Sequence, residues 1–289
     1  MTWFVLRKFA VLLAIVLVTA VLVWWLLAGV PKSTVQGDFS SWLGHLLVGN
    51  FGLSQAGEAI GPMLGARLAV TLPLALLAML LGTAVGSGIG WLAALAPGSV
   101  ADRALTGLSD LGLATPNFWL GMMLAMAFAS GLHWLPPGGF VPWQQGPLAA
   151  LASLVLPAMA LAAPAAAALA QQVRSTLADA ASAPAVLGAQ VRGATRRDAV
   201  RRSRGRALLT FGSPLARQFA AVVAGTVVVE NVFYLPGLGR LILDAVSTRD
   251  LATLRGGLLV LVLMSAGIVF LIEIAFAWLD PRRRAGVPE

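Results

Sequence analysis

Long runs of apolar residues dominate the chain, and short polar stretches separate them. A bilayer core of about 30 Å needs roughly 20 apolar residues in a helix, and six segments reach this length. The third segment is the least apolar, because it contains Asp110, Pro116 and Asn117. The pattern predicts six transmembrane helices, at residues 9–29, 68 to about 95, 104 to about 131, 147 to about 170, 207–229 and 256–279.

The composition agrees with a membrane protein. Hydrophobic residues make up 58% of the chain and charged residues 11%, with a mean hydropathy of +0.86. Soluble domains carry about 25% charged residues, so we expect an all-α integral membrane protein. The net charge of +8 does not indicate nucleic-acid binding, because the basic residues stand in short loops between apolar runs. The absence of cysteine excludes disulfides and thiolate metal sites.

The basic residues also predict the orientation of the helices. Arg7 and Lys8 precede the first span, and Arg103 lies between the second and third. Together with Arg174, the seven arginines between 192 and 206 and those after the sixth span, 14 of the 20 Lys and Arg residues fall on one side. Because positive residues favour the cytoplasm, both termini are predicted to be cytoplasmic. The first span exceeds the roughly 7–15 apolar residues of a cleaved signal peptide, so we expect an uncleaved anchor.

The chain divides into three predicted regions. Residues 1–67 form an anchor helix with a short external segment, residues 68–279 form the transmembrane core, and residues 280–289 form a cytoplasmic tail. Within the core, residues from about 171 to 206 make a cytoplasmic loop between the fourth and fifth spans.

This loop has two predicted helices. The first covers residues 185–192 and ends at Gly193, a residue suited to a left-handed C-cap. It bears little charge and presents apolar side chains such as Leu187, so it needs a groove in a partner protein. The second helix begins after Thr195 and carries most of the arginines, which suit the anionic cytoplasmic leaflet.

Three ionisable residues, Asp110, Arg217 and Glu273, lie inside the predicted spans. Such residues are rare in membranes and are functional candidates. Asp110 and Glu273 are close enough to the predicted cytoplasmic ends to reach the headgroups. Arg217 is about 16 Å deeper than Arg206, at about 1.5 Å per residue, which predicts a place near the middle of the bilayer. It either touches a transport pathway or pairs with a backbone carbonyl or with Glu273.

Small residues in two of the spans favour close helix packing. They are Gly82, Gly86, Gly88 and Gly90 in the second span and Ala163, Ala165, Ala166, Ala167, Ala168 and Ala170 in the fourth. Prolines within the spans, including Pro116, can kink the helices, because neighbouring groups satisfy the freed carbonyls.

The sequence lacks the usual signatures of an enzyme. Neither Lys8 nor Lys32 follows the glycine-rich loop of a P-loop ATPase, and no H-E-x-x-H or G-x-S-x-G motif occurs. His45 and His133 lie outside the predicted spans and far apart. We therefore expect no catalytic residue, no metal and no cofactor bound by this chain.

Seven motif matches, in order along nearly the whole chain, resemble the permease subunits of binding-protein-dependent ABC importers, in the dipeptide, oligopeptide and nickel branch. The segment 189–193 stands where that family has the core of its cytoplasmic coupling loop. One such match would carry little weight, whereas seven in the right order are specific. The matches are 49–54 (GNFGLS), 69–75 (AVTLPLA), 116–121 (PNFWLG), 135–139 (LPPGG), 189–193 (AQVRG), 230–239 (ENVFYLPGLG) and, counted together, 249–250 (RD) with 280–282 (DPR).

The resemblance implies a transport subunit in the bacterial cytoplasmic (inner) membrane. Such a permease pairs with a second, similar permease, and each coupling loop docks on one of two ATPase subunits, which bind and hydrolyse ATP. An extracytoplasmic binding protein delivers the substrate. By position, Ala189, Arg192 and Gly193 would be coupling residues, and Leu187 joins them through its place on the predicted docking helix.

Some features depart from the family pattern. Gln190 and Val191 replace an arginine and an alanine of the usual loop, and the proline expected near residue 210 occurs later, as Pro214. The segment between the first two spans is short and lacks the family's PGDP element. The cargo therefore stays open among peptides, nickel chelates and glutathione-like molecules. A self-contained channel or secondary transporter is the alternative, and Arg217 is the feature that favours it.

The first testable prediction concerns Gly193. If this glycine ends the coupling helix with a positive φ, a β-branched residue there strains the backbone. We expect Gly193→Val to uncouple ATP hydrolysis from transport while membrane insertion stays intact. The measurement is ATP hydrolysed per substrate molecule transported in proteoliposomes, and normal coupling in this variant would contradict the prediction.

Overall fold

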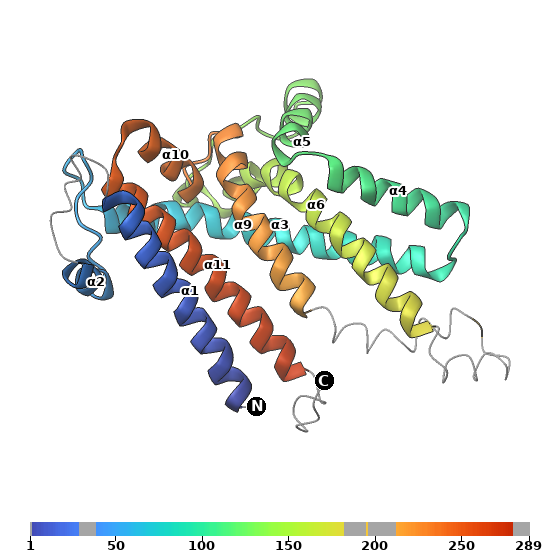
Figure 1. Cartoon of the computed structure of the whole chain (residues 1–289). Coiled ribbons are helices and arrows are strands. Elements are labelled where there is room, and N and C mark those ends of the chain that lie inside the picture. Colours follow the sequence, from blue (N-terminus) through green and yellow to red (C-terminus); the bar gives the residue numbers. More distant parts are fainter. Residues whose placement is uncertain (1, 29–38, 182–194, 196–211, 280–289) are drawn as a thin grey trace.

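The computed structural model describes residues 2–28, 39–181, 195 and 212–279, and the regular structure within these ranges is helical (Figure 1). One isolated bridge joins Leu53 and Ala59. The helices are α1 (Thr2–Ala28), α2 (Phe39–Leu47), α3 (Ile60–Leu95), α4 (Val100–Ala114), α5 (Asn117–Leu124), the π-helix η1 (Ala125–Gly131), the 3-10 turn η2 (Trp143–Gln145), α6 (Pro147–Ala181), α9 (Gly212–Val232), α10 (Leu238–Thr248) and α11 (Leu251–Leu279).

Five of the described helices, α1, α3, α6, α9 and α11, are long and apolar enough to cross a membrane. They correspond to five of the six predicted spans. α3 begins at Ile60, eight residues before the predicted start, so the predicted domain boundary at residue 67 falls inside a helix. α6 likewise continues past the predicted end to Ala181. The orientation of the helices in the membrane stays a prediction.

The third predicted span is not one continuous helix. α4 ends at Ala114, α5 starts at Asn117, and the axes of α4 and of the Asn117–Gly131 helix differ by 104°. Proline explains the break, because it lacks an N–H and disfavours helical geometry in the residue before it. Thr115 accordingly has a ψ of 121°. The chain has a sixth span only if this bent pair counts as one.

The contact between α3 and α6 is the most extensive of the described helix pairs. A Cβ on Gly86 would overlap the carbonyl oxygen of Ala166, and a Cβ on Gly90 would overlap that of Ala170. The predicted close packing of small residues is therefore confirmed at these positions. Gly88 differs, because a Cβ there would meet no atom within 4 Å.

α1 lies at the edge of the bundle, where it packs along α11 (Figure 1). The Nζ atom of Lys8 is 2.8 Å from Oε1 of Glu273, and the rings of Phe9 and Phe270 meet edge to face with centroids 6.3 Å apart. The first turns of α1 thus lie beside the last turns of α11. Most other side chains of α1 are exposed.

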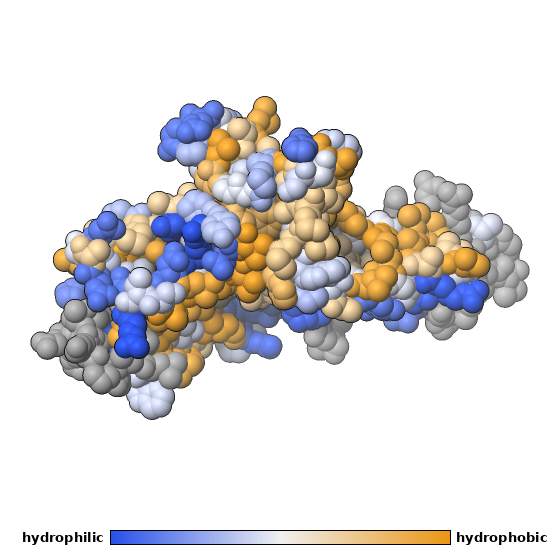
Figure 2. All heavy atoms as spheres, turned by 90° about the horizontal axis from the view of Figure 1, so that it is seen from above, coloured by the Kyte–Doolittle hydropathy of each residue, from blue (hydrophilic) through white to orange (hydrophobic). Residues whose placement is uncertain are grey.

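The face of the molecule drawn in Figure 2 has hydrophobic residues across much of its middle. Hydrophilic residues are most numerous toward the left, and others lie along the lower edge at the right. The left end, called the α10 end below, holds α2, α10, the beginning of α3 and the beginning of α11 (Figure 1). Neither α2 nor α10 has a counterpart among the helices predicted from the sequence.

A matched pair of glycine variants tests the α3–α6 contact. We expect Gly86→Ala to lower the free energy of unfolding by about 1–3 kcal/mol, because the new methyl group must displace the backbone of α6. Gly88→Ala is the control, since it makes the same change in helix propensity without meeting another atom. Thermal unfolding of the purified protein in detergent gives the measurement, and equal midpoints for the two variants would contradict this packing.

Candidate functional site

A buried carboxylate lies at the α10 end, near the end of α9. Glu230 has no exposed surface, and it accepts hydrogen bonds from Thr71 Oγ1 (2.6 Å) and from the N–H groups of Gly239 (2.7 Å) and Arg240 (3.2 Å). Thr71 Oγ1 in turn accepts the N–H of Leu238 at 2.8 Å. Two side chains from other helices thereby satisfy the free N–H groups in the first turn of α10. The carboxylate of Glu230 also lies at the N-terminus of α10, where the helix dipole favours a negative charge.

Two glycines allow the carboxylate to come this close. A Cβ on Gly237 would overlap the carboxylate of Glu230, and a Cβ on Gly239 would overlap the backbone of Val227. The glycines of the 230–239 segment are thus explained by the close approach of α10 to α9.

Three of the sequence motifs meet at Phe233, which is buried. The N–H of Gly139 donates to the carbonyl oxygen of Phe233 at 2.7 Å, and a Cβ on Gly138 would lie 2.8 Å from the same oxygen. A Cβ on Gly121 would lie 2.9 Å from the Phe233 ring. The segments 116–121, 135–139 and 230–239 therefore pack together, and Thr71 adds the segment 69–75. We call these contacts of Thr71, Gly121, Gly139, Glu230 and Phe233 the motif junction.

The loop that contains the motif 49–54 meets the motif 249–250 through Gln55, the residue that follows the first motif. Asp250 accepts the backbone N–H of Gln55 at 3.1 Å and the hydroxyl of Thr253 at 2.7 Å. The carbonyl of Gly52 accepts the N–H of Ile60, the first residue of α3. This loop thereby joins the start of α3 to the start of α11.

A second polar cluster lies toward the opposite end, where α6 ends. Nε and Nη2 of Arg174 donate to the two carboxylate oxygens of Asp102 at 2.6 and 2.8 Å, and Asp102 also accepts the N–H of Gly98 at 2.8 Å. Asp102 is 2% exposed. Nearby, Nε2 of Gln171 donates to Oδ1 of Asp110 at 2.7 Å. These contacts connect α4 with α6.

The ionisable residues singled out in the predicted spans have different surroundings. Asp110 accepts a hydrogen bond from Gln171, and Glu273 forms an ion pair with Lys8. The alternative that Arg217 pairs with Glu273 is therefore wrong. Arg217 is exposed, takes part in none of the ion pairs among the described residues and lies on the second turn of the described part of α9.

The predicted coupling residues Leu187, Ala189, Arg192 and Gly193 lie outside the described residues, so their roles stay predictions. Within the described ranges, no group of three or more His, Asp or Glu residues is placed to hold a metal ion. The sequence pattern missed the Glu230–Thr71 and Asp102–Arg174 contacts. For the Asp102–Arg174 contact, the sequence offered one local indication: Ser99 suits the N-cap of a helix, and it caps α4 by accepting the N–H of Asp102.

Residues 86–285 match the family described as the inner membrane component of binding-protein-dependent transport systems. The chain belongs to this family. It is therefore a multi-pass protein of the bacterial inner membrane, and the motif junction and the α4–α6 contacts are features of a transport permease.

Several relatives support this assignment. A putative peptide transport system permease protein of Brucella abortus is 30% identical, and the match covers 98% of this chain and 99% of the relative. The oligopeptide transport system permease protein AppB of Bacillus subtilis is 30% identical over 85% of this chain and 79% of the relative. The glutathione transport system permease protein GsiC of Salmonella choleraesuis is 28% identical over 86% and 79%.

A solved structure also shares the fold. Inward-facing MetNI, a methionine ABC transporter, contains a chain that aligns with a TM-score of 0.58 at 19% identity. The alignment covers 78% of this chain and 97% of that chain. The transmembrane fold of an ABC transporter thus accounts for most of the structure.

The motif junction makes a prediction about stability. We expect Glu230→Ala to cost about 2–5 kcal/mol, because it leaves the Thr71 hydroxyl and two N–H groups of α10 buried without an acceptor. Glu230→Gln retains an acceptor oxygen and should cost less. Asp244→Ala is the control, since this α10 carboxylate is 59% exposed. Thermal unfolding in detergent measures the series, and equal effects of Glu230→Ala and Asp244→Ala would refute it.

Proposed function

We propose that this chain is the membrane-spanning permease subunit of an ATP-driven ABC importer and that its cargo is a peptide or a similar small solute. A second permease completes the translocation pathway, two ATPase subunits supply the energy, and an extracytoplasmic binding protein delivers the cargo. The support for peptides is the name of the Brucella relative, which matches nearly the full length of both chains. The glutathione permease adds a small peptide-like cargo among the relatives.

The observation that carries the pathway proposal is the exposed face of α9. This face combines one charge with small and polar side chains. Its members are Ser213, Arg217, Ala220, Ala221, Ala224, Val228 and Asn231. Arg217 lies five residues into the span Gly212–Val232. A charged side chain that faces lipid within a span costs free energy, so Arg217 favours a face that meets water or protein.

The exposed faces of α1 and α11 have a different chemistry. On α1 they carry large apolar residues such as Leu13, Leu17 and Val18, and on α11 they carry Leu263 and Leu271. Such faces suit lipid, whereas the α9 face does not. The α9 face is therefore the part of this bundle best suited to line an aqueous pathway shared with the second permease.

Coupling to the ATPases is assigned to the segment between α6 and α9. Leu187, Ala189, Arg192 and Gly193 are the proposed contact residues, and the segment from about 185 to 206 is the proposed docking element. ATP binds to the partner subunits and not to this chain. α6 supports this assignment, because it is a 35-residue helix whose last turns lead directly into the segment.

Purification of the complex tests the proposal. The chain is co-expressed with candidate second permease and ATPase subunits from the same organism, and uptake of labelled peptide is measured in proteoliposomes with the binding protein. We expect the ATPases to co-purify and uptake to require ATP. Uptake that persists without any ATPase would instead support a self-contained channel or secondary transporter.

Arg217 provides the residue-level prediction. We expect Arg217→Ala to lower peptide uptake about tenfold, equivalent to ~1.4 kcal/mol, and Arg217→Lys to retain most of it because the charge remains. Single cysteines at Ala221 and Ala224 should react with a water-soluble thiol reagent in the assembled transporter. Cysteines at Leu13 and Leu263 are the lipid-facing controls, and the cysteine-free chain removes background. Equal reactivity at all four positions would argue against this pathway face.

A further inference from the structure

We propose that Asp102 and Arg174 are positioning residues that hold α4 on α6, so that the two helices move as one body when force reaches the end of α6. This inference rests on the proposed function, because it takes the ATPases to act on the segment that follows α6. It assigns a role to residues outside both the predicted coupling residues and the α9 face.

The geometry of the ion pair suits a rigid connection. Arg174 uses two nitrogens of its planar guanidinium, Nε and Nη2, and binds both oxygens of Asp102. Bidentate pairs of this kind fix orientation as well as distance. Asp102 is 2% exposed and also accepts the N–H of Gly98, so the loop before α4 is included in the same connection. Loss of Arg174 would leave the buried carboxylate of Asp102 without its charged partner.

Further contacts along the same two helices reinforce the pair. The amide of Gln171, three residues before Arg174, donates to Asp110 at 2.7 Å. Farther along α4, a Cβ built on Gly112 would lie 3.1 Å from the Cβ of Ala167. α4 and α6 thus stay close from the ion pair at Asp102 to the last turn of α4.

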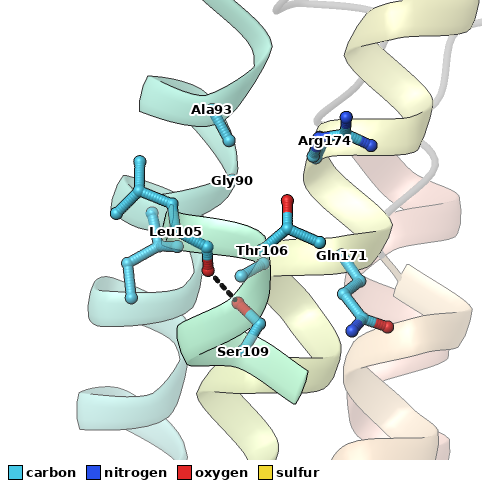
Figure 3. Close-up of a pocket in the computed structure, with 9 residues that line it drawn as sticks. Gly90, Ala93, Leu105, Thr106, Ser109, Gln171 and Arg174 are labelled. Carbon is cyan, nitrogen blue, oxygen red and sulfur yellow. Dashed lines mark hydrogen bonds between the residues drawn. The ribbon is translucent and has the colours of Figure 1, made fainter. Parts of the chain in front are cut away.

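A small cavity lies beside the ion pair, between α3, α4 and α6. Figure 3 shows Thr106 and Ser109 of α4 beside Gly90 of α3 and Gln171 and Arg174 of α6. The cavity that they surround has a volume of about 10 Å³, room for about one water molecule. A cavity of this size leaves the side chains that line it little room to rearrange.

The position of the pair gives it a mechanical role. Arg174 is seven residues from the end of α6 at Ala181, about 10 Å along the helix. At the other end of α4, the chain breaks at Pro116 and continues as α5, where Gly121 packs on Phe233 of the motif junction. A displacement of α6 therefore reaches the bent α4–α5 pair through Asp102 and Arg174. The alternative is that α4 slides along α6 during transport and the pair breaks and reforms.

A disulfide between the two helices separates these alternatives. Gly112→Cys and Ala167→Cys are combined, since their Cβ atoms come close to the roughly 3.5–4.5 Å of a disulfide after a small adjustment. If α4 and α6 move together, the oxidised double variant transports peptide with unchanged coupling. Transport that stops on oxidation and returns on reduction would overturn the proposal. The single-cysteine variants are the controls for the substitutions themselves.

Removal of the ion pair is the second arm. We expect Asp102→Ala to lower the number of peptides transported per ATP by about fivefold or more, within the usual range of coupling free energies. Arg103→Ala, on the exposed face of α4, is the matched control. The oxidised Gly112→Cys/Ala167→Cys disulfide should restore coupling in the Asp102→Ala background, because it holds the same two helices. Unchanged coupling in Asp102→Ala, or no rescue by the disulfide, would overturn the proposal.

These outcomes are distinct from failure of the proposed function. If no ATPase co-purifies with the unaltered chain, the proposed function fails before any variant is made. If the unaltered complex transports peptide with ATP, each arm reports on the α4–α6 contact alone. The disulfide arm also stays decisive if Asp102→Ala does not fold, because it leaves the ion pair in place.

Discussion

The close approach of α3 and α6 is the contact against which the rest of the bundle is arranged. Lipid tails are as apolar as the helices, so burial of hydrophobic surface gives little drive for helix association in a membrane. Contact then depends on how closely two backbones can approach. Gly86 and Gly90 let α3 reach the carbonyl oxygens of α6, and α4 and α9 pack against both of these helices. A methyl group at either glycine would separate the central pair.

Most polar side chains buried in this bundle have a partner, whereas Nε and Nη1 of Arg255, which is 2% exposed, have no hydrogen-bond partner among the described residues. Glu230 lies among donors from α3 and α10, Asp102 among donors from α6 and the loop before α4, and Glu273 beside Lys8. Each of these contacts joins a helix to another segment of the chain. The cost of taking a carboxylate out of water is thus offset by contacts that also fix the relative position of helices. Arg217 differs, because it is exposed and has no such partner among the described residues.

Local sequence predicted the long helices well, because hydropathy over about 20 residues is itself a local property. It also predicted the close packing of Gly86 and Gly90, but not that Gly88 faces open space. The bend at Pro116 was visible as a proline, whereas its 104° angle depends on what α4 and α5 each pack against. α10 was missed because its 11 residues are too few and too polar for a span.

The site was harder to predict than the helices. Thr71 and Glu230 are 159 residues apart in the sequence, and Asp102 and Arg174 are 72 apart, so no local pattern joins either pair. The motifs did mark the residues of the junction, since Glu230, Phe233, Gly121 and Gly139 all belong to segments that resemble the family. The motifs alone do not explain why these positions are glycine. The structure explains it, because each glycine lies where α10, α5 or a loop comes close to the end of α9.

The break at Pro116 connects these two sets of contacts. A straight helix from Val100 to Gly131 would keep one direction and could not follow α6 at its start and also turn by 104° toward Phe233. The proline divides the segment, so α4 packs along α6 while α5 packs on both α6 and α9. Each half is anchored by its own contact, Asp102 to Arg174 on α4 and Gly121 to Phe233 on α5. The α4–α5 pair therefore contacts the last turns of α6 through α4 and the motif junction through α5, and only the short stretch around Pro116 separates the two helices.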